Sequence, residues 1–190
     1  MLVESGHRIK GGRYSGSASL YISVPGPVAG GGAPGQLAQD RETLAGMRSD
    51  GSVSYAVIGG ADPLVYQASD SLVQMVRALH ELKYSVILEV RGNIRPQEWV
   101  KKEADLFLVR LEPEMKSVFY EDSVLLTYPR EKTDYTVVCD GVDDALLAHF
   151  CLTFLRGVEA VYLIHSAGRD ISALSEKVKK IGINPVDCPS

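Results

Sequence analysis

Cysteine is scarce in this chain of 190 residues, and the first of its three cysteines is Cys139. The spacing of Cys139, Cys151 and Cys188 fits neither a zinc site nor a Cys-x-x-Cys redox pair. A sparse, odd set of this kind is typical of reduced, buried thiols in a cytosolic protein. We therefore expect no disulfide framework, and a cytoplasmic location.

Basic charge and long apolar runs are lacking as well. The formal net charge is −4 and the basic residues are scattered, so we expect no nucleic-acid partner. No apolar run reaches the ~18 residues of a membrane span, so we expect no membrane insertion. Residues 1–12 carry three basic or histidine side chains without an apolar stretch after them, which predicts no signal peptide.

Six short apolar runs are spread along the chain, and each reads as a strand. They are almost continuously apolar rather than alternating, which is typical of parallel strands buried on both faces. The predicted strands are Leu20–Val24, Val53–Ile58, Tyr84–Val90, Asp105–Leu111, Tyr135–Cys139 and Ala160–His165.

Helical periodicity fills most of the intervals between these runs. Apolar residues recur at helical spacing from Leu72 to Leu82, from Val142 to Phe154 and from Ile171 to Ile181. Ser69 or Asp70 is the expected N-cap of the first of these helices, and Asp170 of the third. Pro96–Glu103 predicts a short helix, Gln36–Met47 a weaker one, and Ser123–Tyr128 a β-hairpin or edge strand.

Alternation of strands and helices over residues 17–187 predicts a single α/β domain, preceded by an N-terminal extension, 1–16. Two architectures suit the pattern: an open doubly wound sheet and a partial (βα)6 barrel of the TIM type, both with mostly parallel strands. Both place ligands at the carboxyl ends of the strands. The predicted site therefore does not depend on the choice between them.

Polar residues at those carboxyl ends are the candidate ligand-binding residues. They are Gly59, Gly60 and Asp62 after the second predicted strand; Glu89, Arg91 and Asn93 at the end of the third; Arg110 on the fourth; Asp140 after the fifth; and His165 on the sixth.

Each of these residue types suits a particular chemistry and has a structural alternative. Glycine without a Cβ lets backbone or ligand approach closely. His165 suits a general base near neutral pH, and a capping role at the strand end is the alternative. Arg91 and Arg110 suit a carboxylate or phosphate clamp, or else neutralise nearby glutamates. Asp140 fits a carboxylate pair with Glu89, or a helix cap.

Two motifs resemble those of the radical S-adenosylmethionine (SAM) superfamily. Gly59-Gly60-Ala61-Asp62-Pro63-Leu64 is similar to the family's Gly-Gly-Glu-Pro-Leu, with one extra residue and Asp for Glu. Leu88-Glu89-Val90-Arg91-Gly92-Asn93 is similar to its Leu-Glu-Thr-Asn-Gly. The similarity is greatest to small members, such as activating enzymes and 7-carboxy-7-deazaguanine synthase. It covers roughly Ser17 to Pro185, and it implies a partial barrel and SAM as a ligand.

The chain departs from this family at its cluster loop. Members hold a 4Fe–4S cluster through a Cys-x-x-x-Cys-x-x-Cys loop after the first strand. The equivalent segment here, Pro25–Gln36, contains no Cys, His, Asp or Glu. Because such clusters need thiolate ligands, we expect no iron–sulfur cluster and no reductive cleavage of SAM.

Three functional hypotheses follow from this combination. The first is a cluster-less pseudoenzyme that acts by binding or regulation. It would hold a small anionic ligand such as SAM or a nucleotide, or bind a protein partner through the glycine-rich Pro25–Gln36 loop. The second is an enzyme with non-radical chemistry that uses Glu89, Arg110, Asp140 and His165. The third is a structural subunit of a larger assembly.

Overall fold

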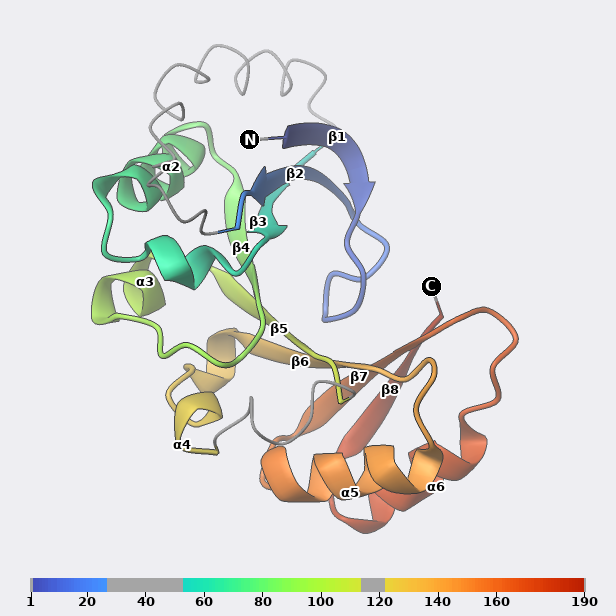
Figure 1. The fold of residues 1–190 in the computed structure, drawn as a ribbon. Helices are drawn as coiled ribbons and strands as arrows, with labels where there is room; N and C mark the ends of the chain where they lie inside the picture. The colour runs from blue at the N-terminus through green and yellow to red at the C-terminus, as the bar shows by residue number, and fades with distance from the viewer. Residues whose placement is uncertain (1, 27–52, 114–121, 190) are drawn as a thin grey trace. The chain divides into compact units, whose positions relative to one another are not determined.

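The structure is a computed structural model that describes residues 2–26, 53–113 and 122–189 (Figure 1). The predicted helix Gln36–Met47 lies outside these ranges. So does the predicted partner loop Pro25–Gln36, apart from its first two residues. Nothing in the described structure tests those two predictions.

Among the described residues, eight strands form one sheet in the order β1 to β8, and β8 does not pair with β1, so the sheet is open. β1 pairs antiparallel with β2, whereas β2–β3, β3–β4, β6–β7 and β7–β8 pair in parallel. The predicted α/β class with mostly parallel strands is therefore confirmed. The strands are β1 Leu2–Arg8, β2 Ala18–Val24, β3 Tyr55–Gly60, β4 Ser85–Val90, β5 Leu106–Leu111, β6 Thr133–Val138, β7 Ala160–His165 and β8 Asn184–Pro189.

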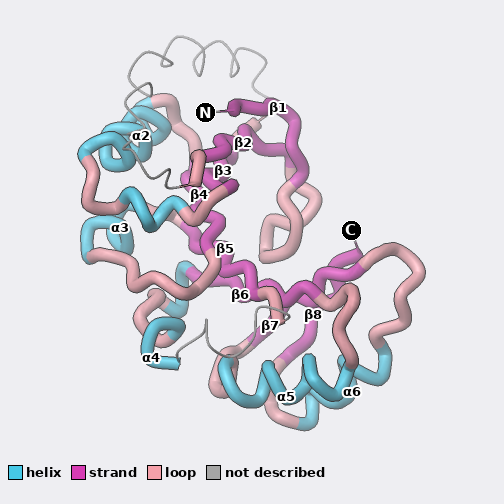
Figure 2. Tube along the Cα trace, viewed as in Figure 1, coloured by secondary structure: helices cyan, strands magenta, loops and turns pink. Residues whose placement is uncertain are grey.

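Helices follow most of the parallel strands (Figure 2). They are η2 Pro63–Tyr66, α2 Asp70–Glu81, α3 Glu98–Glu103, α4 Asp122–Leu125, η3 Arg130–Lys132, α5 Asp144–Phe154 and α6 Ser172–Lys180. One prediction was wrong: Ser123–Tyr128 holds helix α4 and a turn, not a hairpin or edge strand. The Thr127 amide and hydroxyl both donate to the Val124 carbonyl, which closes a helical turn that the apolar run did not reveal.

Two compact units make up the chain. The first holds Met1–Ile9, Gly16–Val90 and Pro96–Phe107, and the second holds Lys10–Ser15, Arg91–Arg95 and Leu108–Ser190. In the first unit α2 packs against β4. Its core is formed by fully buried side chains of β2, β3, β4 and α2, among them Ile22, Ile58, Leu88, Leu72 and Leu79.

In the second unit α5 and α6 pack beside one another, and α6 packs on β8 (Figure 1). The segment Lys10–Ser15 packs on β6 and β7. A Cβ on Gly11 would lie 2.7 Å from Thr136 Cγ2, and one on Gly12 would lie 2.8 Å from Leu108 Cδ1. Both glycines have positive φ, so this close approach depends on residues that lack a side chain.

Two strands were not predicted, β1 and β8, and they end the sheet on either side. β1 lies in the predicted N-terminal extension, where charged residues and a bulge near Gly6 hide the strand pattern. β8 contains Pro185 and Pro189, which lack an amide donor and are tolerated in strands at a sheet edge.

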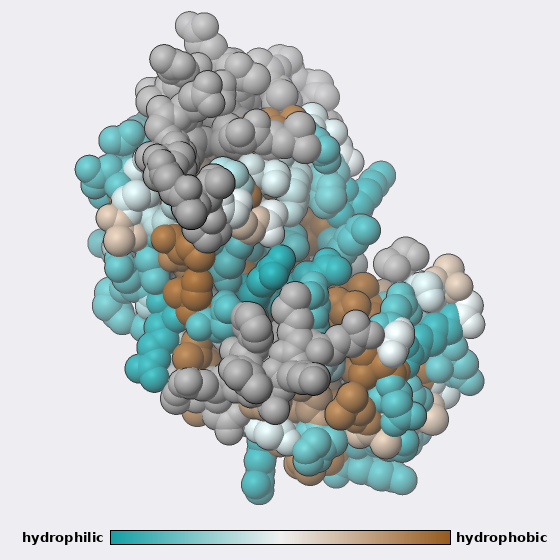
Figure 3. Space-filling view, viewed as in Figure 1, coloured by the Kyte–Doolittle hydropathy of each residue, from teal (hydrophilic) through white to brown (hydrophobic). Residues whose placement is uncertain are grey.

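Hydrophilic residues make up much of the coloured surface in Figure 3, and apolar residues show there in smaller areas. The exposed large apolar side chains among the described residues are Val65, Leu126, Leu146 and Leu152. On α5, Leu146 is exposed, whereas its neighbour Leu147 is fully buried. Within the described ranges, no helix is long and apolar enough to cross a membrane.

Candidate functional site

The carboxyl end of β3 lies in the first unit, and Gly59 is buried there. A Cβ on Gly59 would lie 2.6 Å from the Tyr21 hydroxyl oxygen and 3.2 Å from Glu89 Cβ. Since successive side chains of a strand alternate between faces, Tyr21, Gly59 and Glu89 share one face of β2, β3 and β4. The missing side chain of Gly59 therefore leaves room for the Tyr21 hydroxyl beside the Glu89 Cβ at this end of the sheet.

Gly60 is required for a different reason. Its φ is +89°, a conformation that favours glycine, and a Cβ there would lie 2.5 Å from Ser23 Oγ and 2.9 Å from the Val24 carbonyl oxygen. The adjacent Ala61 amide donates to that same carbonyl at 3.1 Å. Gly60 thus lets the chain leave β3 while it stays close to the end of β2.

Asp62 turns the chain into the next helix. Its carboxylate accepts the Leu64 amide at 2.9 Å, which caps η2, and the residue is only 8% exposed. Further along η2, the Tyr66 hydroxyl donates to the Pro25 carbonyl at 2.8 Å. The motif residue that resembles the family's glutamate therefore has a clear local role as a helix cap.

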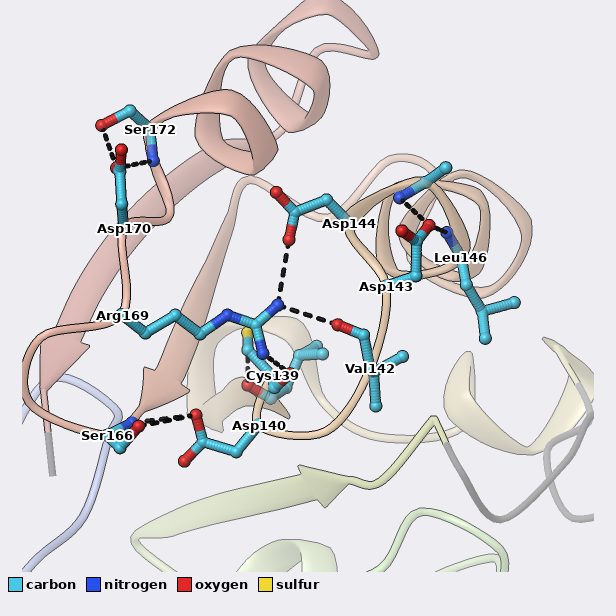
Figure 4. Close-up of polar contacts among 12 residues, drawn as sticks. Cys139, Asp140, Val142, Asp143, Asp144, Leu146, Ser166, Arg169, Asp170 and Ser172 are labelled. Carbon is cyan, nitrogen blue, oxygen red and sulfur yellow. Dashed lines mark hydrogen bonds and ion pairs between the residues drawn. The ribbon is translucent and has the colours of Figure 1, made fainter.

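In the second unit, Asp140 follows β6 and Ser166 follows β7. The Asp140 carboxylate accepts both the Ser166 amide, at 3.0 Å, and its hydroxyl, at 3.2 Å (Figure 4). These hydrogen bonds favour the ionised form and hold the pKa of Asp140 below its ordinary value. Because Ser166 directly follows His165 in the chain, these hydrogen bonds bring the two predicted residues Asp140 and His165 close together.

Arg169 ties the loop after β6 to the start of α5. Its guanidinium donates to the carbonyls of Cys139 and Val142, the latter at 2.8 Å, and to the Asp144 carboxylate at 2.9 Å (Figure 4). Asp143 caps the same helix by accepting the Ala145 amide. The Arg169 guanidinium therefore donates its hydrogen bonds to two backbone carbonyls and a carboxylate of the chain.

His165 is buried at the carboxyl end of β7, with hydrogen-bond acceptors at both ring nitrogens. Nε2 lies 2.6 Å from the Asp187 carboxylate on β8, and Nδ1 lies 3.0 Å from the Ser166 carbonyl oxygen. Both nitrogens can bond in this way only when both carry protons. The hydrogen bond to Asp187 raises the pKa of His165 accordingly. The geometry therefore suits an imidazolium held in place, rather than a neutral general base.

The remaining predicted residues also lie in the second unit. Arg110 Nε is 3.4 Å from a Glu112 carboxylate oxygen, so Arg110 neutralises a neighbouring glutamate, one of its two predicted roles. Arg91 is exposed. Asn93 Oδ1 is a buried oxygen without a hydrogen-bond partner among the described residues. Whether these residues share a site with Gly59, Gly60, Asp62 and Glu89 stays a prediction.

Three site residues were missed by the sequence analysis: Tyr21, Arg169 and Asp187. Tyr21 was detectable in principle, because Ser19, Tyr21 and Ser23 alternate with apolar residues along one strand. The interactions of the other two depend on pairing between distant segments, which leaves no local signal. No group of three His, Cys, Asp or Glu side chains placed to hold a metal ion occurs within the described ranges.

Comparison with known proteins finds no matching family model and no curated relative. Among solved structures, the chain is similar to SuiB from Streptococcus suis, with a TM-score of 0.50 and 12% identity over 79% of this chain and 42% of that one. A second SuiB structure, bound to S-adenosylmethionine, matches with a TM-score of 0.44 and 13% identity over 79% of this chain and 43% of that one. The chain thus spans less than half of the SuiB chain, and the likeness is one of fold.

Proposed function

We propose that this chain is a binding protein for SAM, with the ligand at the carboxyl ends of β3 and β4, and that its open sheet is a partial barrel of the radical-SAM type. The observation that carries the proposal is that the Tyr21 hydroxyl and the Glu89 Cβ both lie close to the space that Gly59 leaves open. Gly59 and Glu89 belong to the two family-like motifs of the sequence. SuiB, whose fold is similar, binds SAM in one of its structures.

Charge favours SAM over a nucleotide at this position. Segments 18–24, 59–66 and 85–90 contain no lysine or arginine, and Arg91, which follows β4, belongs to the second unit, whereas Glu89 lies at the end of β4. A carboxylate suits the ammonium and sulfonium groups of SAM and repels a polyphosphate. We therefore expect SAM to bind more tightly than ATP.

The residues of this chain do not fit the iron–sulfur cluster of the radical-SAM family. The segment Pro25–Gln36 has no thiol. Cys139, Cys151 and Cys188 are buried in the second unit, and burial raises the pKa of Cys139 and Cys151 to about 12. A cluster requires thiolate ligands. We accordingly propose that SAM is bound without reductive cleavage, in a pseudoenzyme with a binding or regulatory role.

Calorimetric titration of SAM into wild-type protein, Glu89→Gln and Glu4→Gln tests this proposal. Glu4 is an exposed glutamate on β1 of the same unit and serves as the matched control. We expect Glu89→Gln to weaken SAM binding about tenfold, since a charged hydrogen bond contributes ~1.5 kcal/mol. Equal affinities of the two variants would contradict the proposed site.

The other hypotheses have less support. A non-radical enzyme that uses His165 would need an available ring nitrogen, and Asp187 and the Ser166 carbonyl engage both. A protein partner bound through Pro25–Gln36, and a structural role in a larger assembly, stay predictions. If the protein binds SAM and carries no iron after anaerobic reconstitution, that result would favour the pseudoenzyme hypothesis over the alternatives.

A further inference from the structure

A cavity of about 390 Å³ lies in the second unit, at the amino ends of β6 and β7. Thr133 and Asp134 are the first two residues of β6, Ala160 is the first residue of β7, and Arg156 lies just after α5. This is the opposite end of these strands from Asp140 and His165. The volume lies within the ~300–1,000 Å³ range of small-molecule sites.

Three arginines line this cavity, and one of them is neutralised. Arg13 donates to both oxygens of the Asp134 carboxylate, at distances of 2.6 to 3.1 Å, through its side chain and its backbone amide. Arg130 and Arg156 have no carboxylate partner among the described residues, and Glu159 also lines the space. The unpaired groups therefore leave an excess of one positive charge.

Apolar and aromatic side chains also line the cavity. Among them are Leu125, Leu126, Tyr128 and Tyr135. The Tyr128 hydroxyl donates to the Ile94 carbonyl and the Tyr135 hydroxyl to the Leu125 carbonyl, so both phenols are engaged by the protein backbone. Leu126 is 68% exposed, which is a large apolar surface in contact with water. A ligand with an apolar body would cover it.

We propose that this cavity binds a small organic anion, in which a phosphate or carboxylate group meets Arg130 and Arg156 and an apolar body lies on Leu126. Arginine suits both anionic groups, because its planar donors match their oxygens. The site is separate from the proposed SAM site and does not depend on it.

An NMR titration with phenyl phosphate tests the proposal on the full chain. We expect saturable binding, weakened about tenfold by Arg130→Gln and by Arg156→Gln. Glu159→Gln should tighten binding, since it removes the one unpaired acid named above. Leu126→Ser should weaken phenyl phosphate binding and leave inorganic phosphate unaffected. The matched control is Arg77→Gln, an exposed arginine on α2 of the first unit, which should change nothing.

Two further measurements identify the class of anion and distinguish this cavity from the proposed SAM site. Benzoate in place of phenyl phosphate distinguishes a carboxylate ligand from a phosphate ligand, and binding of either supports the proposal. Excess SAM should not displace the probe. Absence of binding by both probes at millimolar concentration would overturn the proposal. So would binding that Arg130→Gln and Arg156→Gln leave unchanged while circular dichroism shows both variants folded.

Discussion

Arg13 encloses the carboxylate of Asp134: its guanidinium and its backbone amide together donate to both carboxylate oxygens, with the shortest bond at 2.6 Å. The Asp134 side chain is only 5% exposed, whereas that of Arg13 is 41% exposed. The carboxylate raises the pKa of the Arg13 guanidinium, mainly through these hydrogen bonds. The pair therefore holds the segment Lys10–Ser15 against the first residues of β6.

Loss of this arginine should therefore destabilise the protein. Arg13→Gln leaves a buried carboxylate with only part of its hydrogen bonds, and we expect the free energy of unfolding to fall by about 2–3 kcal/mol. Urea denaturation measures the change. The exposed Arg77→Gln is the control and should stay within ~0.5 kcal/mol of wild type. Equal stability of the two variants would show that the pair contributes nothing.

Gly60 should tolerate a side chain less well than Gly16, although both have positive φ. A Cβ on Gly16 meets nothing within 4 Å, so Gly16→Ala should cost only the backbone strain of ~1 kcal/mol. Gly60→Ala adds contacts of 2.5 Å to Ser23 and 2.9 Å to the Val24 backbone, and should cost about 3 kcal/mol. Thermal unfolding compares them, and equal losses would mean that packing at Gly60 is irrelevant.

The His165–Asp187 pair should make stability depend on pH. Because the folded pKa of His165 is raised, its contribution is fully present below the unfolded pKa of ~6.5 and is lost as pH rises through the folded pKa. Asp187→Asn should therefore cost about 1 kcal/mol at pH 5.5 and clearly less at pH 9, a modest value because Asp187 is 65% exposed. A cost independent of pH would contradict this assignment.

The three cysteines should be unreactive in the folded protein. With a pKa of about 12, about one Cys139 or Cys151 thiol in ten thousand is ionised at pH 8. Burial raises the pKa of Cys188 too. We expect negligible reaction with Ellman's reagent in native buffer and three equivalents in urea. Rapid release of one equivalent from native protein would show an accessible thiol.

Much of the fold was predictable because apolar residues dominate its central strands. Six of the eight described strands lie where their continuous apolar runs placed them, α2, α5 and α6 lie where their periodicity did, and α3 lies within the predicted helix Pro96–Glu103. The outer strands β1 and β8 were missed because strands at a sheet edge need few apolar residues and tolerate proline. Helix α4 was mistaken for extended chain because its two apolar residues, Val124 and Leu125, are too few to show a period.

The candidate site was less predictable than the fold. Sequence placed Gly59, Gly60 and Asp62 at the end of a strand, and the structure finds them there. It did not reveal that the Tyr21 hydroxyl lies over Gly59, because that contact depends on the register between β2 and β3. It also gave no sign of the cavity lined by Arg130 and Arg156, since residues on η3 and after α5 meet only in the folded chain.

The most direct test of the central proposal is a titration of isotope-labelled protein with SAM, followed by amide NMR. We predict saturable shifts at Tyr21, Gly59, Gly60 and Glu89, with much smaller shifts for the same concentration of ATP. The amides near Arg130 and Arg156 should stay unchanged. An absence of shifts at millimolar SAM, or shifts that avoid the carboxyl ends of β3 and β4, would contradict the proposal that this chain binds SAM there.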